Sequence, residues 1–185
     1  MTERAKRGAA YADIERAPDD RIAELVLGDL YLSPRPSLRH ALAASALVTL
    51  LGDAFHFGRS GPGGWWILFE PEVRSWGDVL VPDIAGWRRE HLAAIPDGVG
   101  IHLPPDWVCE VLSQSTELFD RNQKLPRYAD LGVKHLWLVD PAARRVEVYE
   151  RAGLVWARLE VHGADAVISA PPFEAVPLEL LSLWG

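Results

Sequence analysis

The sequence predicts an α/β fold in which a mixed β-sheet is flanked by helices and preceded by an N-terminal β-hairpin. The main observation is the order of the elements expected beyond residue 36, which is helix, strand, strand, strand, helix, strand. A second observation is the length of 185 residues with no internal segment of linker-like composition. We therefore expect a single domain over residues 1–185.

The chain before the first long helix is expected to form a leader and then the hairpin. Residues 1–18 contain basic side chains with no apolar run behind them, so they are not a secretory signal and are interpreted as a partly ordered leader. In Arg21–Ser33, apolar residues alternate on both sides of Gly28-Asp29. This alternation around a turn pair is typical of a β-hairpin.

A helix and two strands follow the hairpin. Ser37 is a good N-cap residue, and the apolar stripe after it predicts a helix to about Leu51 that ends at Gly52. The next apolar segments are Trp65–Val73 and Val79–Trp87, and the tight turn between them predicts an antiparallel pair.

The second half of the chain predicts a strand, a helix and further strands. A helix is expected from about Asp120 to Leu131, with its regular part beginning near Asn122 so that Pro126 lies in the first turn. Gly132 is expected to stop it. The predicted strands are Trp107–Leu112, His135–Asp140, Arg145–Tyr149 and Leu154–Val161, and the apolar residues of the tail Pro171–Gly185 are expected to pack on the body.

Composition limits the class of protein. Hydrophobic residues make up 49% of the chain and charged residues 24%, as in folded globular domains, and the apolar runs are too short to predict a membrane span. The single cysteine cannot form an internal disulfide, so a reducing compartment, the cytoplasm, is the expected location. A net charge of −7 argues against non-specific coating of nucleic acid but is compatible with a local basic face.

Three residues suggest a metal-assisted reaction. Glu110 is an acid within the apolar strand Trp107–Leu112, where an unpaired carboxylate is costly to bury, and Asp83 is expected on a neighbouring strand. Two carboxylates can hold Mg²⁺ together with water, and a nearby ammonium such as that of Lys124 can stabilise an attacking anion. Taken alone, Asp83 is equally compatible with a turn residue, and Lys124 with a surface partner of Asp120.

Four blocks of residues follow one another along the chain in a distinctive order. They are Glu24-Leu25 with Gly28 and Leu30, then Val81-Pro82-Asp83-Ile84, then Glu110-Val111-Leu112-Ser113 with Ser115, and then Lys124-Leu125-Pro126 with Tyr128-Ala129, Gly132-Val133 and Trp137-Leu138-Val139-Asp140. Together these blocks resemble the Uma-type restriction endonuclease family of the PD-(D/E)xK nuclease superfamily, and the similarity spans roughly Ile22–Tyr149.

The resemblance implies a restriction-endonuclease-like core over about residues 22–150 and DNA cleavage that depends on Mg²⁺, with Mn²⁺ as a substitute. It implies Asp83, Glu110 and Lys124 as catalytic residues, with Asp83, Glu110 and the backbone carbonyl of Val111 holding the metal. Cutting both strands would further imply a homodimer. One position departs from the superfamily pattern, because Leu112 stands where the lysine is expected two residues after the acid; Lys124 on the following helix matches the displaced lysine of the family.

Accessory roles and a second class of function remain open at this point. Glu72, Glu24 and His40 are candidates for a third carboxylate or a supporting contact, but each is more typical of an ordinary surface or packed residue. The alternative function is a catalytically inactive nuclease-fold module that binds nucleic acid or protein. The acidic net charge and the absent lysine at position 112 motivate that alternative.

Overall fold

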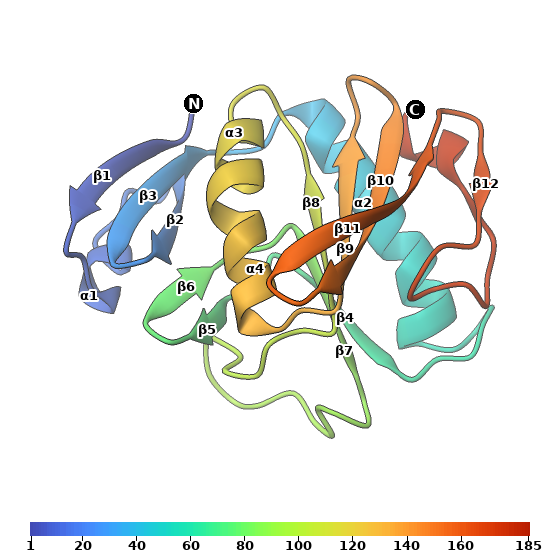
Figure 1. The fold of residues 1–185 in the computed structure, drawn as a ribbon, viewed down its shortest axis with the longest axis horizontal. Helices are drawn as coiled ribbons and strands as arrows, with labels where there is room; N and C mark the ends of the chain where they lie inside the picture. The colour runs from blue at the N-terminus through green and yellow to red at the C-terminus, as the bar shows by residue number, and fades with distance from the viewer.

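The structure, a computed structural model that describes residues 1–185, contains a six-stranded and a five-stranded sheet (Figure 1). The larger sheet has the order β11-β10-β9-β8-β7-β4. Only β8 and β9 run parallel; the other neighbours are antiparallel. Its strands are β4 (Trp65–Phe69), β7 (Ile84–Arg88), β8 (Trp107–Val111), β9 (His135–Asp140), β10 (Arg145–Ala152) and β11 (Val155–His162). The prediction of a mixed sheet is confirmed.

The smaller sheet has the order β1-β3-β2-β6-β5 and is antiparallel throughout. Its strands are β1 (Glu3–Arg7), β2 (Arg21–Val26), β3 (Asp29–Pro34), β5 (Val73–Ser75) and β6 (Asp78–Leu80). The predicted N-terminal hairpin is β2–β3, with Leu27 and Gly28 in the turn, both at positive φ. Residues 1–18, expected as a partly ordered leader, hold β1 and the short helix α1 (Tyr11–Ile14).

The first long helix, α2 (Leu38–Leu51), begins as predicted, with the Ser37 hydroxyl accepting a hydrogen bond from the His40 amide. The predicted end at Gly52 is wrong. Gly52 keeps right-handed helical angles, and the helix continues through the π-helical turn η1 (Gly52–His56), whose Phe55 is buried in the core. Burial of that extra turn against the sheet outweighs the weak helix propensity of glycine.

The combined helix Leu38–His56 is long and apolar enough to cross a membrane by length and composition alone, although the apolar runs of the sequence are too short to predict a span. Its Ala43, Ala44 and Leu47 are buried against one face of the larger sheet, in the larger of the hydrophobic clusters. Figure 1 shows the helix lying alongside that sheet. The packing is that of a core helix.

The predicted pair of strands 65–73 and 79–87 is divided between the two sheets. β4 and β7 pair in the larger sheet, whereas β5 and β6 pair in the smaller one. Pro71 and Pro82 lie at the two breaks, and neither can donate a ladder hydrogen bond. The chain therefore crosses between the sheets twice, and the Glu70 amide, which donates to the Asp83 carbonyl, joins the two crossings.

The second long helix consists of α3 (Glu117–Phe119), the π-helical turn η2 (Asp120–Lys124) and α4 (Leu125–Leu131). It begins earlier than predicted, at Glu117, but its regular part α4 begins at Leu125, so Pro126 lies in the first turn of that part as predicted. The Leu125 amide bonds to the Asp120 carbonyl five residues back, and this wider turn makes room for the proline ring. Gly132 ends the helix in the left-handed conformation, as predicted.

This second helix covers the other face of the larger sheet. Tyr128 packs with Val108 and Leu112, whereas Cys109 and Val111 of the same strand belong to the cluster under α2. Glu110 therefore points toward the second helix, and Cys109 faces the opposite side. The tail holds β12 (Val167–Ile168), β13 (Leu178–Glu179) and the 3₁₀ turn η3 (Leu180–Leu183), which pack on the cluster under α2 together with the fully buried Phe173.

Candidate active site

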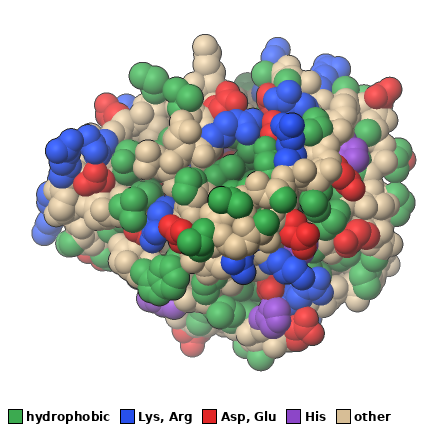
Figure 2. All heavy atoms as spheres, viewed as in Figure 1, with side chains coloured by type: hydrophobic (Ala, Val, Ile, Leu, Met, Phe, Trp, Pro, Cys, Tyr) green, Lys and Arg blue, Asp and Glu red, His purple; other side chains and the backbone are tan.

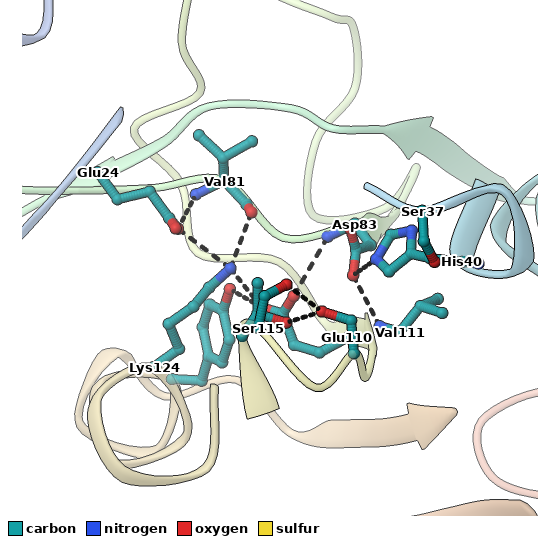
Figure 3. A network of polar contacts seen from close by, with 12 residues as sticks. Glu24, Ser37, His40, Val81, Asp83, Glu110, Val111, Ser115 and Lys124 are labelled. Atoms are coloured by element: carbon teal, nitrogen blue, oxygen red, sulfur yellow. Dashed lines mark hydrogen bonds and ion pairs between the residues drawn. The ribbon is translucent and has the colours of Figure 1, made fainter. Parts of the chain in front are cut away.

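The candidate site lies where the chain crosses from the smaller to the larger sheet. Polar side chains from both sheets and both long helices line one small cavity of about 30 Å³ there. Figure 3 shows most of them pointing toward one another. The acids and bases that line the cavity are Glu24 of β2, His40 of α2, Asp83 after β6, Glu110 of β8, and Asp120 and Lys124 of η2.

Asp83 is held by contacts on two sides. Its Oδ2 lies 3.1 Å from His40 Nε2 and accepts a hydrogen bond of 2.7 Å from the Val111 amide. The Asp83 amide in turn points at Glu110 Oε2, at 3.4 Å. These contacts lock the crossing segment against β8 and bring the two predicted acids to adjacent positions.

Glu110 is buried, with 1% of its surface exposed, and its Oε1 accepts from two donors. The Tyr128 hydroxyl lies 2.5 Å away and the Lys124 ammonium 2.8 Å away. Burial raises the pKa of Glu110 well above its ordinary value; Lys124 opposes that rise, and the negative charges of Asp120 and Asp83 reinforce it. A cation bound near this carboxylate would favour its charged form.

Lys124 reaches the same cavity from the helix above the strand. Its Nζ lies 2.8 Å from Glu110 Oε1, 3.0 Å from Glu24 Oε1 and 2.9 Å from the carbonyl oxygen of Val81. Burial alone would lower the pKa of Lys124, but the charges of Glu110 and Glu24 outweigh it and hold the pKa well above its ordinary value. The side chain is therefore a buried ammonium with all three N–H donors engaged.

One residue that lines the cavity, Asp120, and one that lies beside Asp83 outside it, Glu70, were not among the predicted ones. Asp120 is 4% exposed and lines the cavity, and burial raises its pKa to about 7, helped by the charge of Asp83 and opposed by Lys124. Glu70 stands beside Asp83 at a positive φ of 46°, and burial together with the charge of Asp83 raises its pKa. The spacing of Asp120 from Lys124, one helical turn, could have placed the former; nothing in the sequence marks the backbone turn at Glu70.

Glu72 lies away from the cavity, and Val111 reaches the site through its main chain. Glu72 is bound to Arg74 at 2.7 Å and contacts the Tyr11 hydroxyl, and it does not line the cavity. Val111 presents its amide to Asp83. Two arginines near Lys124 on the second helix are bound to other acids and not to the site, because Arg121 binds Glu147 and Arg127 binds Asp78.

The residues of the site suit a small, hard cation. No three His, Cys, Asp or Glu side chains form a ready-made cluster of ligands. Mg²⁺ needs few protein ligands because it usually retains several waters and binds one or two carboxylates. Four acids here face one lysine and one histidine, and a cavity of about 30 Å³ can hold water or one ion. Asp83 and Glu110 would hold the cation most directly.

Comparison with known structures defines the class of fold. The crystal structure of a "putative nuclease belonging to DUF820" from Anabaena variabilis is similar to this chain, with a TM-score of 0.72 and 21% sequence identity. The similarity covers 95% of this chain and 97% of the other. The fold is thus that of a nuclease-like α/β protein, as predicted.

The family follows from the sequence comparison. The model of the Uma2 family, described as "Putative restriction endonuclease", matches residues 9–180, and the chain belongs to this family. The resemblance found in the sequence is confirmed, and it extends beyond both ends of the Ile22–Tyr149 segment. Comparison with curated proteins finds no match to this chain. Family and fold together support a nuclease.

Proposed function

We propose that this protein is a metal-dependent endonuclease that hydrolyses phosphodiester bonds in DNA. The observation that carries the proposal is the 2.8 Å contact between Lys124 and Glu110, with Asp83 alongside. An acid pair and an ammonium thus share one cavity although position 112 is a leucine. Family membership and the nuclease-like fold support the same class of reaction.

In this proposal Asp83, Glu110 and the backbone carbonyl of Val111 hold Mg²⁺, or Mn²⁺ in its place. The bound ion supplies positive charge that offsets the charge of the reacting phosphate and favours ionisation of water. The charged ammonium of Lys124 orients the attacking water and stabilises developing negative charge. His40 and Tyr128 hold the carboxylates of Asp83 and Glu110 in place through the contacts described above.

The substrate has an open approach next to the buried cavity. A groove of about 650 Å³ shares His40, Ser113 and Ser115 with the site and is also lined by Arg39. Arg39 is exposed and forms no ion pair, so it is free to contact a phosphate. Figure 2 shows acidic and basic side chains interspersed over the face in view, which fits local phosphate contacts better than a broad basic belt.

Cleavage of both strands of a duplex in one binding event requires two such sites, and we propose that a homodimer supplies them. We propose the cytoplasm as its location. A monomeric protein would nick one strand at a time. Light scattering on the purified protein, with and without a DNA duplex, tests the assembly.

The test of the proposed function is incubation of the purified protein with supercoiled plasmid and Mg²⁺ or Mn²⁺. The expected result is conversion to nicked or linear DNA that stops with EDTA and is reduced by about 10²-fold or more in Asp83→Asn, Glu110→Gln and Lys124→Met. Glu90→Gln, which changes an exposed acid, is the matched control. Unaltered cleavage by the three site variants would refute the assignment.

One observation favours the second candidate, an inactive nuclease-fold module that binds nucleic acid or protein. All three donors of Lys124 are engaged within the protein, as expected of a structural ion-pair network. This candidate predicts that the wild type cleaves no DNA with either metal ion, whether or not it binds DNA.

A further inference from the structure

We infer that Glu24 is a positioning residue for Lys124, so that the smaller sheet is a working part of the active site. The inference rests on the proposed function, in which Lys124 acts on water and phosphate. Glu24 lies on β2 and is 2% exposed. Its Oε1 accepts from the Lys124 ammonium at 3.0 Å and from the Val81 amide at 2.8 Å.

The contacts form a closed ring around the lysine. Val81 accepts from Lys124 through its carbonyl oxygen at 2.9 Å and donates to Glu24 through its amide, while Glu24 binds Lys124 directly. Figure 3 shows the three groups facing one another at one end of the network, with Asp83 and His40 at the other. The ring therefore fixes the ammonium from the side remote from Asp83.

A lysine that reaches the site from a helix needs contacts that hold its side chain in one orientation. Lys124 is not on the strand that carries Glu110, and its long side chain loses considerable rotamer entropy when it is fixed in one place. Glu24 and Val81 account for two of the three N–H donors, which leaves the third directed at Glu110. The orientation of the ammonium is thus set even when Glu110 changes its partner.

Glu24 itself is better suited to hold the lysine than to hold a cation. Its Oε1 already accepts from two N–H donors, the Val81 amide and the Lys124 ammonium. The strand that carries Glu24 is fixed on both sides, by β3 and by the Leu25–Val79 pair with β6. A rigid, buried acceptor of this kind holds a charged donor in one geometry.

The first test measures the reactivity of lysine amines by mass spectrometry, without DNA or metal. Lys6 and Lys134, the other lysines of the chain, are exposed and serve as internal references. We expect Lys124 to be protected in the wild type and to react about tenfold faster in Glu24→Ala, the factor that corresponds to one lost charged hydrogen bond. Glu24→Gln retains an acceptor oxygen and is expected to lie between them.

The second test measures plasmid cleavage by the same proteins. Glu24→Ala is expected to lower kcat about 10- to 100-fold with KM within about twofold, and Glu24→Gln to recover part of the loss. Asp29→Ala is the matched control, because this acid of the adjacent strand pairs with Arg4 at the surface. If circular dichroism shows that Glu24→Ala does not fold, Glu24→Gln takes its place. It is then compared with the wild type in the labelling test and with Asp29→Ala in the cleavage test.

The outcomes separate the two proposals. Unchanged protection of Lys124 in both Glu24 variants, or a kcat equal to that of Asp29→Ala, overturns the positioning role. If the wild type cleaves no DNA, the proposed function fails, and the labelling result alone still decides whether Glu24 holds Lys124.

Discussion

The imidazole of His40 and the carboxylate of Asp83 are in direct contact, with Nε2 3.1 Å from Oδ2. The contact ties the first turn of α2 to the segment that crosses between the sheets. Burial alone would lower the pKa of His40, but the hydrogen bond and charge of Asp83 outweigh it, so the pKa is raised. The pair is therefore strongest when the imidazole is protonated.

The first prediction concerns His40→Ala. A histidine with a raised pKa stabilises the fold fully below its unfolded pKa of about 6.5, and this contribution is lost as the pH rises through the folded value. The substitution should cost about 1–3 kcal/mol at pH ~5.5 and less at pH ~8.5, as measured by urea unfolding. Arg39→Ala, on the same turn but exposed, is the control. Equal losses at both pH values would contradict the charged pair.

The second prediction concerns metal binding. A cation that binds only the folded state at about 100 times its Kd adds about 2.7 kcal/mol of stability, which for a chain of this size raises Tm by roughly 5–10 °C. Thermal melts with Mn²⁺ or Mg²⁺ should show this rise, and EDTA should reverse it. In Asp83→Asn the rise should disappear, whereas Glu90→Gln should retain it. If neither ion changes the Tm of the wild type, the predicted metal site is absent.

The third prediction concerns Asp120, whose pKa burial raises to about 7 from an ordinary value of 3.8. Between these values the unfolded chain releases the proton that the folded chain still holds, so stability falls as the pH rises. Asp120→Asn removes this loss. Between pH ~4 and pH ~7, the unfolding free energy of the variant should rise relative to that of the wild type by an amount on the order of 3 kcal/mol. Parallel unfolding free energies for the two proteins across this range would disprove a buried, titrating Asp120.

The fourth prediction concerns the tail. Phe173 is fully buried, and its ring lies 4.7 to 5.0 Å from those of Phe55, Trp65 and Trp107. Phe173→Ala should cost about 3–5 kcal/mol in denaturant unfolding, because it leaves a cavity among aromatic rings. Leu181→Ala, at a side chain that is 61% exposed, should change stability by less than about 0.5 kcal/mol. A small loss at Phe173 would mean that the tail is not part of the core.

Much of the fold could be predicted because local patterns agree with the final packing. The hairpin β2–β3, the start of α2 and the end of the second helix at Gly132 follow from alternation, a serine cap and a glycine. The predictions failed where tertiary packing overrides local signals. Gly52 remains helical because the next turn is buried, and a continuous apolar pattern does not reveal that Pro71 and Pro82 divide two strands between two sheets.

The candidate site was predictable in part for a similar reason. Asp83, Glu110 and Lys124 carry distinctive neighbours in the sequence, and the structure places them at one cavity with Glu24 and His40. The local sequence predicts Asp120 only as a partner of Lys124, because it does not show which helix face is buried. It also favours Glu72 over Glu70 as an accessory acid. The structure reverses that order, because the chain breaks at Pro71, Glu72 binds Arg74 and Glu70 lies near Asp83.

The lysine of this site belongs to the helix that covers the sheet, whereas Glu110 belongs to the sheet itself. The two meet only after that helix has docked, since Leu112, Tyr128 and Leu125 pack between the layers in the same cluster. In a chain that is still being synthesised, or is partly unfolded, that helix is not docked and the acids and the lysine are apart. Under the proposed function, such a chain cannot cleave DNA, so activity appears only when folding is complete.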